Sequence, residues 1–151
     1  MKLVILAVGR GRASPEQTLV GDWLDRLPQG GALVEVESRL PSGAARTRDE
    51  ADRLLRHLAP SAPLIACDPR GRDTSSEALA ELLRRYRDDG VPTTYFAIGG
   101  ADGHDSTVLD RAQHKIAFGS ATWPHMLFRA MLAEQLYRAT MILAGHPYHR
   151  A

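Results

Sequence analysis

The sequence predicts a single α/β domain built around a mostly parallel β-sheet. Short apolar runs of strand length alternate along the chain with segments whose apolar residues recur every three or four positions. Strands that alternate with helices of this length are typical of β-α units sharing one parallel sheet. The chain has 151 residues, 44% of them hydrophobic, which suffices for one buried core. We therefore expect one domain over residues 1–151, without a linker or an internal repeat.

The first β-α unit opens the chain. Residues 3–8 form a continuous apolar run rich in branched side chains, which predicts a strand buried on both faces of the sheet. Ser14 followed by Pro15 marks a helix start, because serine caps the first turn and proline fits the first helical position. Apolar residues at helical spacing then predict a helix that ends near Pro28.

The second unit has a wetter strand. Residues 32–38 alternate in part between apolar and acidic side chains, which predicts a strand nearer the edge of the sheet. The segment from Thr47 to Glu50 has the pattern of a capping box, in which the two side chains bond each other's backbone amides. We therefore expect the next helix to begin at Thr47.

The third unit contains a short strand. Residues 64–68 predict a short buried strand, apolar up to Asp68, and we expect it to stop at Pro69 and Gly71, since neither residue favours a strand interior. Ser75 then fits the cap of a helix that reaches Gly90.

The next elements are shorter. Residues 93–98 predict a strand that is halted by two glycines, residues 105–112 a short helix, and residues 115–118 a further strand. These elements continue the β-α alternation and complete the predicted sheet.

The last predicted helix, residues 124–144, differs from the others because it is apolar nearly all round. Its charged residues are Arg129, Glu134 and Arg138, and we interpret Glu134 and Arg138 as an ordinary ion pair one turn apart. A helix of this kind must be buried. One side can pack on the sheet, and a second copy of the same helix is the usual cover for the other. We therefore predict a homodimer through this helix.

Composition excludes several classes of protein. The formal net charge of +1 argues against coating nucleic acid by bulk charge. Cys67 is the single cysteine, so an internal disulfide and a zinc site built on cysteine spacing are excluded, and we expect no metal. No run reaches the roughly 18 apolar residues of a membrane span, and the N-terminus lacks a cleavage site, so we expect a cytoplasmic protein. Gly9 and Gly11 could begin a dinucleotide-binding fingerprint, but Ser14 stands where its third glycine should be. A nicotinamide site is therefore excluded.

Three loops that follow predicted strands form the candidate ligand site. They comprise residues 67–71, 98–103 and 119–125. In open α/β sheets, ligands bind beyond the carboxyl ends of the strands, and consecutive glycines let the backbone approach a ligand closely. Taken alone, the glycine loop is better explained as a plain tight turn, so the evidence for a ligand site comes from its combination with the other two loops.

Four segments together resemble the bacterial 23S rRNA (pseudouridine-N3)-methyltransferase family of the SPOUT superfamily. They are Phe96–Gly103, Thr122–His125, Glu134–Ala139 and His146–Arg150. Their order and spacing match the family, and the similarity runs from the first residue to the last. The resemblance implies a SPOUT fold with a parallel sheet and a C-terminal trefoil knot. It also implies a homodimer whose cofactor pockets lie at the knot, beside the interface.

The resemblance implies S-adenosylmethionine as the cofactor. Carried over by position, the pocket would involve Cys67, Gly100, Gly119, Ser120, Ala121, Thr122, Trp123 and Pro124. The family commonly has leucine where this chain has Cys67, and a Pro-Glu pair where it has Ala101 and Asp102. The role of Asp102 therefore stays open at this point. We interpret His125 as a packed residue at a helix start and not as a catalytic one.

The substrate that the resemblance implies is N3 of a pseudouridine in 23S rRNA of the assembled 70S ribosome. We hypothesise that Tyr148, His149 and Arg150 are catalytic, with Arg150 gripping an RNA phosphate or the developing anion and His149 or water taking the proton. From the residues alone, a solvated polar tail fits this segment equally well. Two other functions stay open: a SPOUT enzyme for another RNA such as tRNA, and a noncatalytic ribosome-binding factor.

Overall fold

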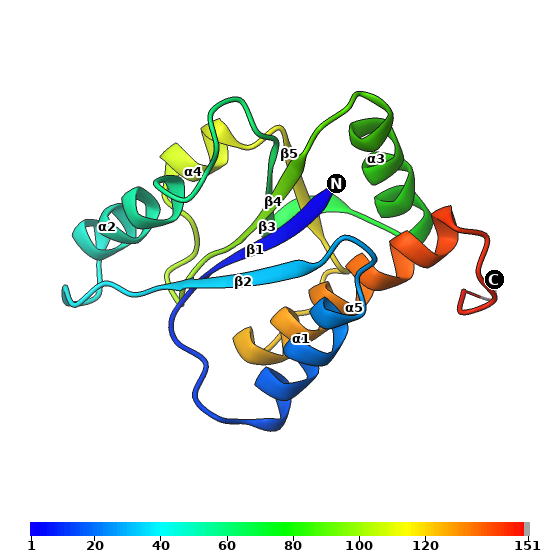
Figure 1. The fold of residues 1–151 in the computed structure, drawn as a ribbon. Coiled ribbons are helices and arrows are strands. Elements are labelled where there is room, and N and C mark those ends of the chain that lie inside the picture. Colours follow the sequence, from blue (N-terminus) through cyan, green and yellow to red (C-terminus); the bar gives the residue numbers. More distant parts are fainter. Residues whose placement is uncertain (150–151) are drawn as a thin grey trace.

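The structure of the protein is a computed structural model that describes residues 1–149 (Figure 1). One five-stranded sheet has the order β2-β1-β4-β3-β5, and every neighbouring pair is parallel. The strands are β1 Lys2–Val8, β2 Gly31–Val36, β3 Leu64–Asp73, β4 Thr93–Ile98 and β5 His114–Ala117. The helices are α1 Pro15–Asp25, α2 Ala44–Leu55, α3 Ser76–Asp88, α4 Ser106–Arg111 and α5 His125–Leu143. The predicted parallel α/β fold is confirmed, and β2 lies at an edge as expected.

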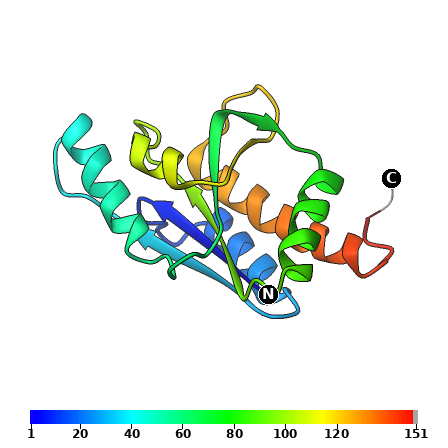
Figure 2. The same ribbon diagram turned by 90° about the horizontal axis from the view of Figure 1, so that it is seen from above.

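Helices cover both faces of the sheet (Figure 2). The helices α1 and α3 both pack against α5 on one face, and α2 and α4 lie together on the other. Side chains of β1 point alternately to the two faces of the sheet. Leu3, Ile5 and Ala7 join a core cluster of 20 buried residues under α1, α3 and α5. Val4, Leu6 and Val8 join a cluster of nine buried residues on the other face. We call these the large-core face and the small-core face.

Three of the predicted helix starts are confirmed by their caps. The Ser14 hydroxyl accepts from the Gln17 amide at 3.2 Å, and the Ser75 hydroxyl accepts from the Ala78 amide at 3.2 Å. Asp105 caps α4. Each side chain satisfies an amide of the first turn that has no partner within the helix.

The predicted start of α2 is wrong. The helix begins at Ala44 after Gly43, whose φ of 131° suits glycine. Thr47 lies inside the helix, where its hydroxyl donates to the Gly43 carbonyl at 3.2 Å. Glu50 does not reach back to a capping position because its side chain is buried against the sheet end, 9% exposed. A tertiary role for Glu50 thus replaces the local one that the sequence pattern suggested.

The predicted end of β3 is also wrong, because the strand continues past Pro69 and Gly71 to Asp73. It leaves β4 after Cys67, and its register against β5 shifts between Cys67 and Arg72. Proline is tolerated in such an irregularity, where the missing amide is not needed for a ladder bond. A Cβ on Gly71 would lie 2.7 Å from backbone atoms of β5, so glycine is required there.

The helix α5 carries one buried charge that its apolar pattern concealed. The Arg129 side chain is fully buried. It donates to Glu35 at 2.6 Å and to the carbonyls of Val8 and Gly9 at 2.7 and 2.8 Å. The Glu35 carboxylate also accepts from the Gly11 amide at 2.5 Å. Arg129 therefore joins α5 to the ends of β1 and β2.

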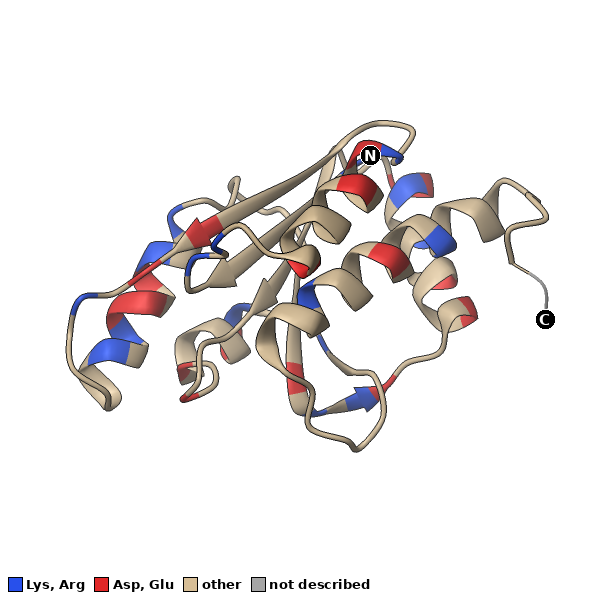
Figure 3. Ribbon diagram, turned by 90° about the horizontal axis from the view of Figure 1, so that it is seen from below, with Lys and Arg blue, Asp and Glu red and all other residues tan. Residues whose placement is uncertain are grey.

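Charges of both signs are interspersed along α2 (Figure 3). Among residues 1–149, no helix has the length and apolarity needed to cross a membrane.

Candidate functional site

A cavity of about 600 Å³ opens beside the irregular part of β3, where that strand leaves β4, and beyond the carboxyl ends of β4 and β5. Its lining comprises Cys67–Arg70, Ile98–His104, Ile116–Gly119, Ala121–Trp123, His125 and Phe128. The three loops singled out from the sequence therefore meet around one space, as the parallel topology requires.

The structure brings together six of the eight residues predicted to bind a cofactor. Those that line the cavity are Cys67, Gly100, Gly119, Ala121, Thr122 and Trp123. Ser120 and Pro124 are exposed and do not line it. Pro124 occupies the cap position of α5 instead.

The cavity has apolar walls that the sequence did not reveal. Ile98 and Ile116 lie at the ends of their strands, and Phe118 and Phe128 bring their ring centroids to 5.4 Å. Phe118 follows β5, whereas Phe128 belongs to α5, so only the folded chain brings the two rings together. Walls of this kind suit a flat heteroaromatic ligand.

The glycine loop is a closed turn. The Gly103 amide donates to the Gly100 carbonyl at 3.0 Å, and Gly103 has a φ of 79°. A Cβ on Gly99 would lie 2.8 Å from the Gly103 carbonyl carbon, a distance that no larger residue tolerates. The sequence of the loop is therefore dictated by the tightness of the turn as well as by any ligand.

Two histidines hold the strand ends that frame the cavity. The His104 ring contacts the Cys67 carbonyl through Nε2 at 3.1 Å, and the His125 ring contacts the Gly99 carbonyl through Nε2 at 2.6 Å. Because a carbonyl can only accept, Nε2 carries the proton in each ring. Burial lowers the pKa of both His104 and His125. Both rings are therefore neutral tethers at pH 7, and His125 packs at the helix start as predicted.

The polar groups at the cavity have contrasting charges. Burial raises the pKa of the Cys67 thiol to about 12, so this wall is uncharged. Hydrogen bonds from Arg70 lower the pKa of Asp68, so Asp68 presents a carboxylate.

The last loop, residues 118–124, is closed by its own tryptophan. The Trp123 indole donates from Nε1 to the Phe118 carbonyl at 3.0 Å, and the Gly119 amide donates to Asp73 at 2.9 Å. Trp123 remains 40% exposed at the edge of the cavity. The loop thus keeps a defined shape while leaving an aromatic surface accessible.

The predicted catalytic tail lies elsewhere in the single chain. The Tyr148 hydroxyl donates to Glu134 at 2.9 Å, and its ring lies beneath the Arg138 guanidinium at 4.8 Å. His149 contacts Glu77 at 2.9 Å. Neither Tyr148 nor His149 lines the cavity, and Arg150 lies outside the described residues. The Glu134–Arg138 ion pair expected from the sequence is present at 2.6 Å.

Comparisons with known proteins agree along the whole chain. A family model described as predicted SPOUT methyltransferase matches residues 1–149. The ribosomal RNA large subunit methyltransferase H of Rhodospirillum rubrum is 49% identical over 152 residues and covers 100% of both chains. The proteins of the same name from Rhizobium etli and Paramagnetospirillum magneticum are 46% and 48% identical, each covering 99% of both chains. The chain therefore belongs to the SPOUT methyltransferase family, which confirms the predicted family and the prediction of a methyltransferase.

Proposed function

We propose that the chain transfers a methyl group from S-adenosylmethionine to N3 of a pseudouridine in 23S rRNA of the assembled bacterial ribosome, acting as a homodimer. One observation carries the proposal. Six residues predicted to bind this cofactor line a single cavity, in a chain that is similar over its full length to large-subunit rRNA methyltransferases.

The cavity fits the proposed cofactor in size and chemistry. Its volume of about 600 Å³ is typical of sites for ligands of this size. The walls of Ile98, Ile116 and Phe118 suit adenine, and the glycine-rich turns leave main-chain groups close to a ligand. The Asp68 carboxylate is already paired with Arg70 at 3.0 Å, so together they bring no net charge to this wall. S-adenosylmethionine, when bound, supplies a methyl group made electrophilic by its sulfonium.

The chain's own contribution is to position the acceptor base and remove its proton. N3 of pseudouridine is weakly acidic, so a base or a nearby positive charge must favour the anion, and orientation alone provides much of the acceleration. We propose that His149 or a water molecule accepts the N3 proton. Arg150 would bind an RNA phosphate or stabilise the developing anion. Tyr148 positions this segment.

The position of the tail favours action on the partner's cavity. The cavity lies at the start of α5. The tail follows the end of α5 in the chain and packs back against Glu134 and Arg138 of that helix. The helix has 19 residues, which span about 28 Å at about 1.5 Å per residue. A two-fold axis perpendicular to α5 would pair the helices antiparallel, and would place the tail of one protomer beside the partner's cavity.

An exposed apolar surface beside α5 supports this dimer. Leu19 of α1 is 44% exposed and Leu127 of α5 is 39% exposed, and both line a groove along α5. They form an apolar surface that a second copy would cover.

The first test is methyl transfer from labelled S-adenosylmethionine to undermethylated 70S ribosomes, compared with free rRNA and tRNA, with mapping of the modified base. We expect label at a pseudouridine on ribosomes alone. Label on tRNA would instead support a different RNA substrate, and binding of cofactor without transfer to any RNA would contradict the proposal. Binding of ribosomes without binding of cofactor would identify a noncatalytic factor.

Deletion of residues 148–151 tests the tail. We expect the truncated protein to fold and bind cofactor, with a Tm lowered by the loss of the Tyr148 contacts to Glu134 and Arg138, while methylation is abolished because the groups at the acceptor base are lost. Mixing it with the cavity-blocked variant Ala121→Trp should restore activity if the tail serves the partner's cavity. Normal methylation by the truncated protein would refute the catalytic role of the tail, and failure of the mixture to recover would refute its action across the dimer.

A further inference from the structure

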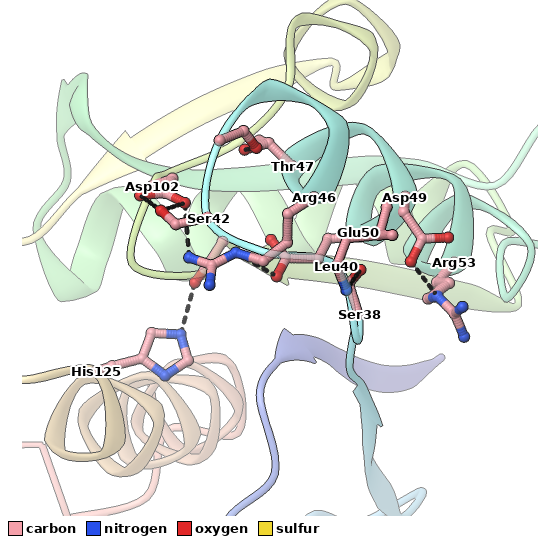
Figure 4. Close-up of polar contacts among 12 residues, drawn as sticks. Ser38, Leu40, Ser42, Arg46, Thr47, Asp49, Glu50, Arg53, Asp102 and His125 are labelled. Atoms are coloured by element: carbon pink, nitrogen blue, oxygen red, sulfur yellow. Dashed lines mark hydrogen bonds and ion pairs between the residues drawn. The ribbon is translucent and has the colours of Figure 1, made fainter.

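The Asp102 side chain, at the outer edge of the cavity, is bound to a different part of the same chain (Figure 4). Arg46, in the first turn of α2, donates to the Asp102 carboxylate at 2.6 Å. The Ser42 hydroxyl, just before α2, donates to the same carboxylate at 3.1 Å. The glycine loop is therefore fastened to α2 by a charge-assisted bond, the stronger kind of hydrogen bond.

Arg46 also contacts a second carboxylate, which lies behind the glycine loop. Its Nε is 3.6 Å from Glu50, whose side chain is only 9% exposed. A Cβ on Gly100 would lie 3.1 Å from the Glu50 carboxylate, so Glu50 packs directly against the loop backbone. Arg46 thus stands between a carboxylate in the loop and a buried carboxylate beneath it.

The charges around Arg46 explain why it matters. Burial raises the pKa of Glu50, and Arg46 opposes that rise. Hydrogen bonds from Arg46 and Ser42 lower the pKa of Asp102. Without the guanidinium, two carboxylates would face each other across the loop, and repulsion would favour moving the loop away from α2.

We propose that Arg46 is a positioning residue, which holds the glycine loop in its binding shape through Asp102 and Glu50. This inference rests on the proposed function, because its measured consequence is affinity for S-adenosylmethionine. It assigns Asp102 a contact within its own chain in place of a direct contact with a ligand. Neither Arg46 nor Glu50 lines the cavity, so Arg46 acts through the shape of the loop.

The test measures S-adenosylmethionine binding by calorimetry and the kinetics of methyl transfer for Arg46→Ala and Asp102→Ala. Loss of one charge-assisted bond corresponds to about a tenfold loss of affinity. We expect the KM for S-adenosylmethionine to rise about tenfold while kcat changes by less than about threefold, because the groups at the acceptor base are untouched. The matched control is Arg53→Ala, since Arg53 makes a similar bond to Asp49 on α2, at 2.8 Å, away from the loop.

A double variant separates positioning from independent contacts. If Arg46 acts through Asp102, Arg46→Ala/Asp102→Ala should bind within about threefold of either single variant. Multiplied losses, or wild-type affinity in Asp102→Ala, would overturn the inference. Asp102 lies on an exposed turn, so its variant decides the question even if Arg46→Ala folds poorly. Failure of the wild-type protein to bind S-adenosylmethionine would instead refute the proposed function.

Discussion

The two faces of the sheet differ in how their helices are held: the large-core face relies on apolar packing, and the small-core face adds ion pairs to a smaller core. The large-core face buries 20 residues under α1, α3 and α5. The small-core face buries nine under α2 and α4, and its outer parts are joined by ion pairs such as Arg46–Asp102 and Arg48–Asp105. The contrast teaches that on the small-core face ion pairs from α2 supplement a thin apolar layer.

Replacing Arg129 should have the largest effect, because it is the buried charge of the large-core face. Arg129→Ala removes the ionic partner of Glu35, which keeps only the Gly11 amide, and the donor to the carbonyls of Val8 and Gly9, and should cost about 3 to 4 kcal/mol of unfolding free energy. Urea denaturation measures this loss. Arg84→Ala is the control, since Arg84 has two exposed ionic partners, Glu81 and Asp88, and its loss should change the unfolding free energy far less. Equal losses would show that burial does not distinguish the two arginines.

Matched leucine truncations compare the two cores directly. Leu136 of α5 and Leu54 of α2 are 0% and 1% exposed. Leu136→Ala should cost about 3 to 4 kcal/mol and Leu54→Ala about 2 kcal/mol, because α2 can settle over the thinner layer. Settling of α2 would also shift Arg46, so Leu54→Ala should bind S-adenosylmethionine more weakly than Leu136→Ala. The opposite order of affinities, measured by calorimetry, would contradict the division between the faces.

The smallest expected effect is the pH dependence from His104 and His125. Their folded pKa values lie below 6.5, the ordinary value, because of burial. The unfolded chain therefore takes up protons first as the pH falls, so stability is full above about pH 6.5 and declines below it. Between pH 8 and 5.5 we therefore expect a small fall in Tm, in the direction set by these lowered pKa values.

Two substitutions isolate this effect. His104→Gln/His125→Gln keeps a donor for each carbonyl but cannot titrate, so its melting temperature should fall less over the same range. The exposed His57 provides the control, and His57→Gln should keep the wild-type dependence. A double variant with an unchanged slope would show that other groups cause the loss.

Local signals in the sequence predicted much of the fold and the placement of the site. The caps Ser14 and Ser75 could be predicted because each bonds an amide only three residues further along the chain. The glycine loop and the last loop could be placed at the cavity because parallel topology puts all carboxyl strand ends at one edge. The extension of β3 past Pro69 could not be predicted, since it depends on the close approach of β5 to Gly71.

Long-range partners account for what the sequence did not reveal. Helical periodicity places Arg129 on a helix, but Glu35, 94 positions away, decides that it is buried. The pattern from Thr47 to Glu50 matches a capping box in the sequence. In the folded chain Glu50 instead packs against the glycine loop, which is distant in sequence. Phe128 becomes a cavity wall because α5 returns to the end of β5.

The tryptophan that closes the last loop gives the protein an optical sensor. The chain has two tryptophans, and Trp23 packs 5.3 Å from the Tyr137 ring, whereas Trp123 lines the cavity. Replacing Trp23 with phenylalanine would leave Trp123 as the one tryptophan. The hydration of its indole ring would change when a ligand fills the space beside it. Titrating S-adenosylmethionine into that variant would test the proposed site by fluorescence, without a label and without turnover.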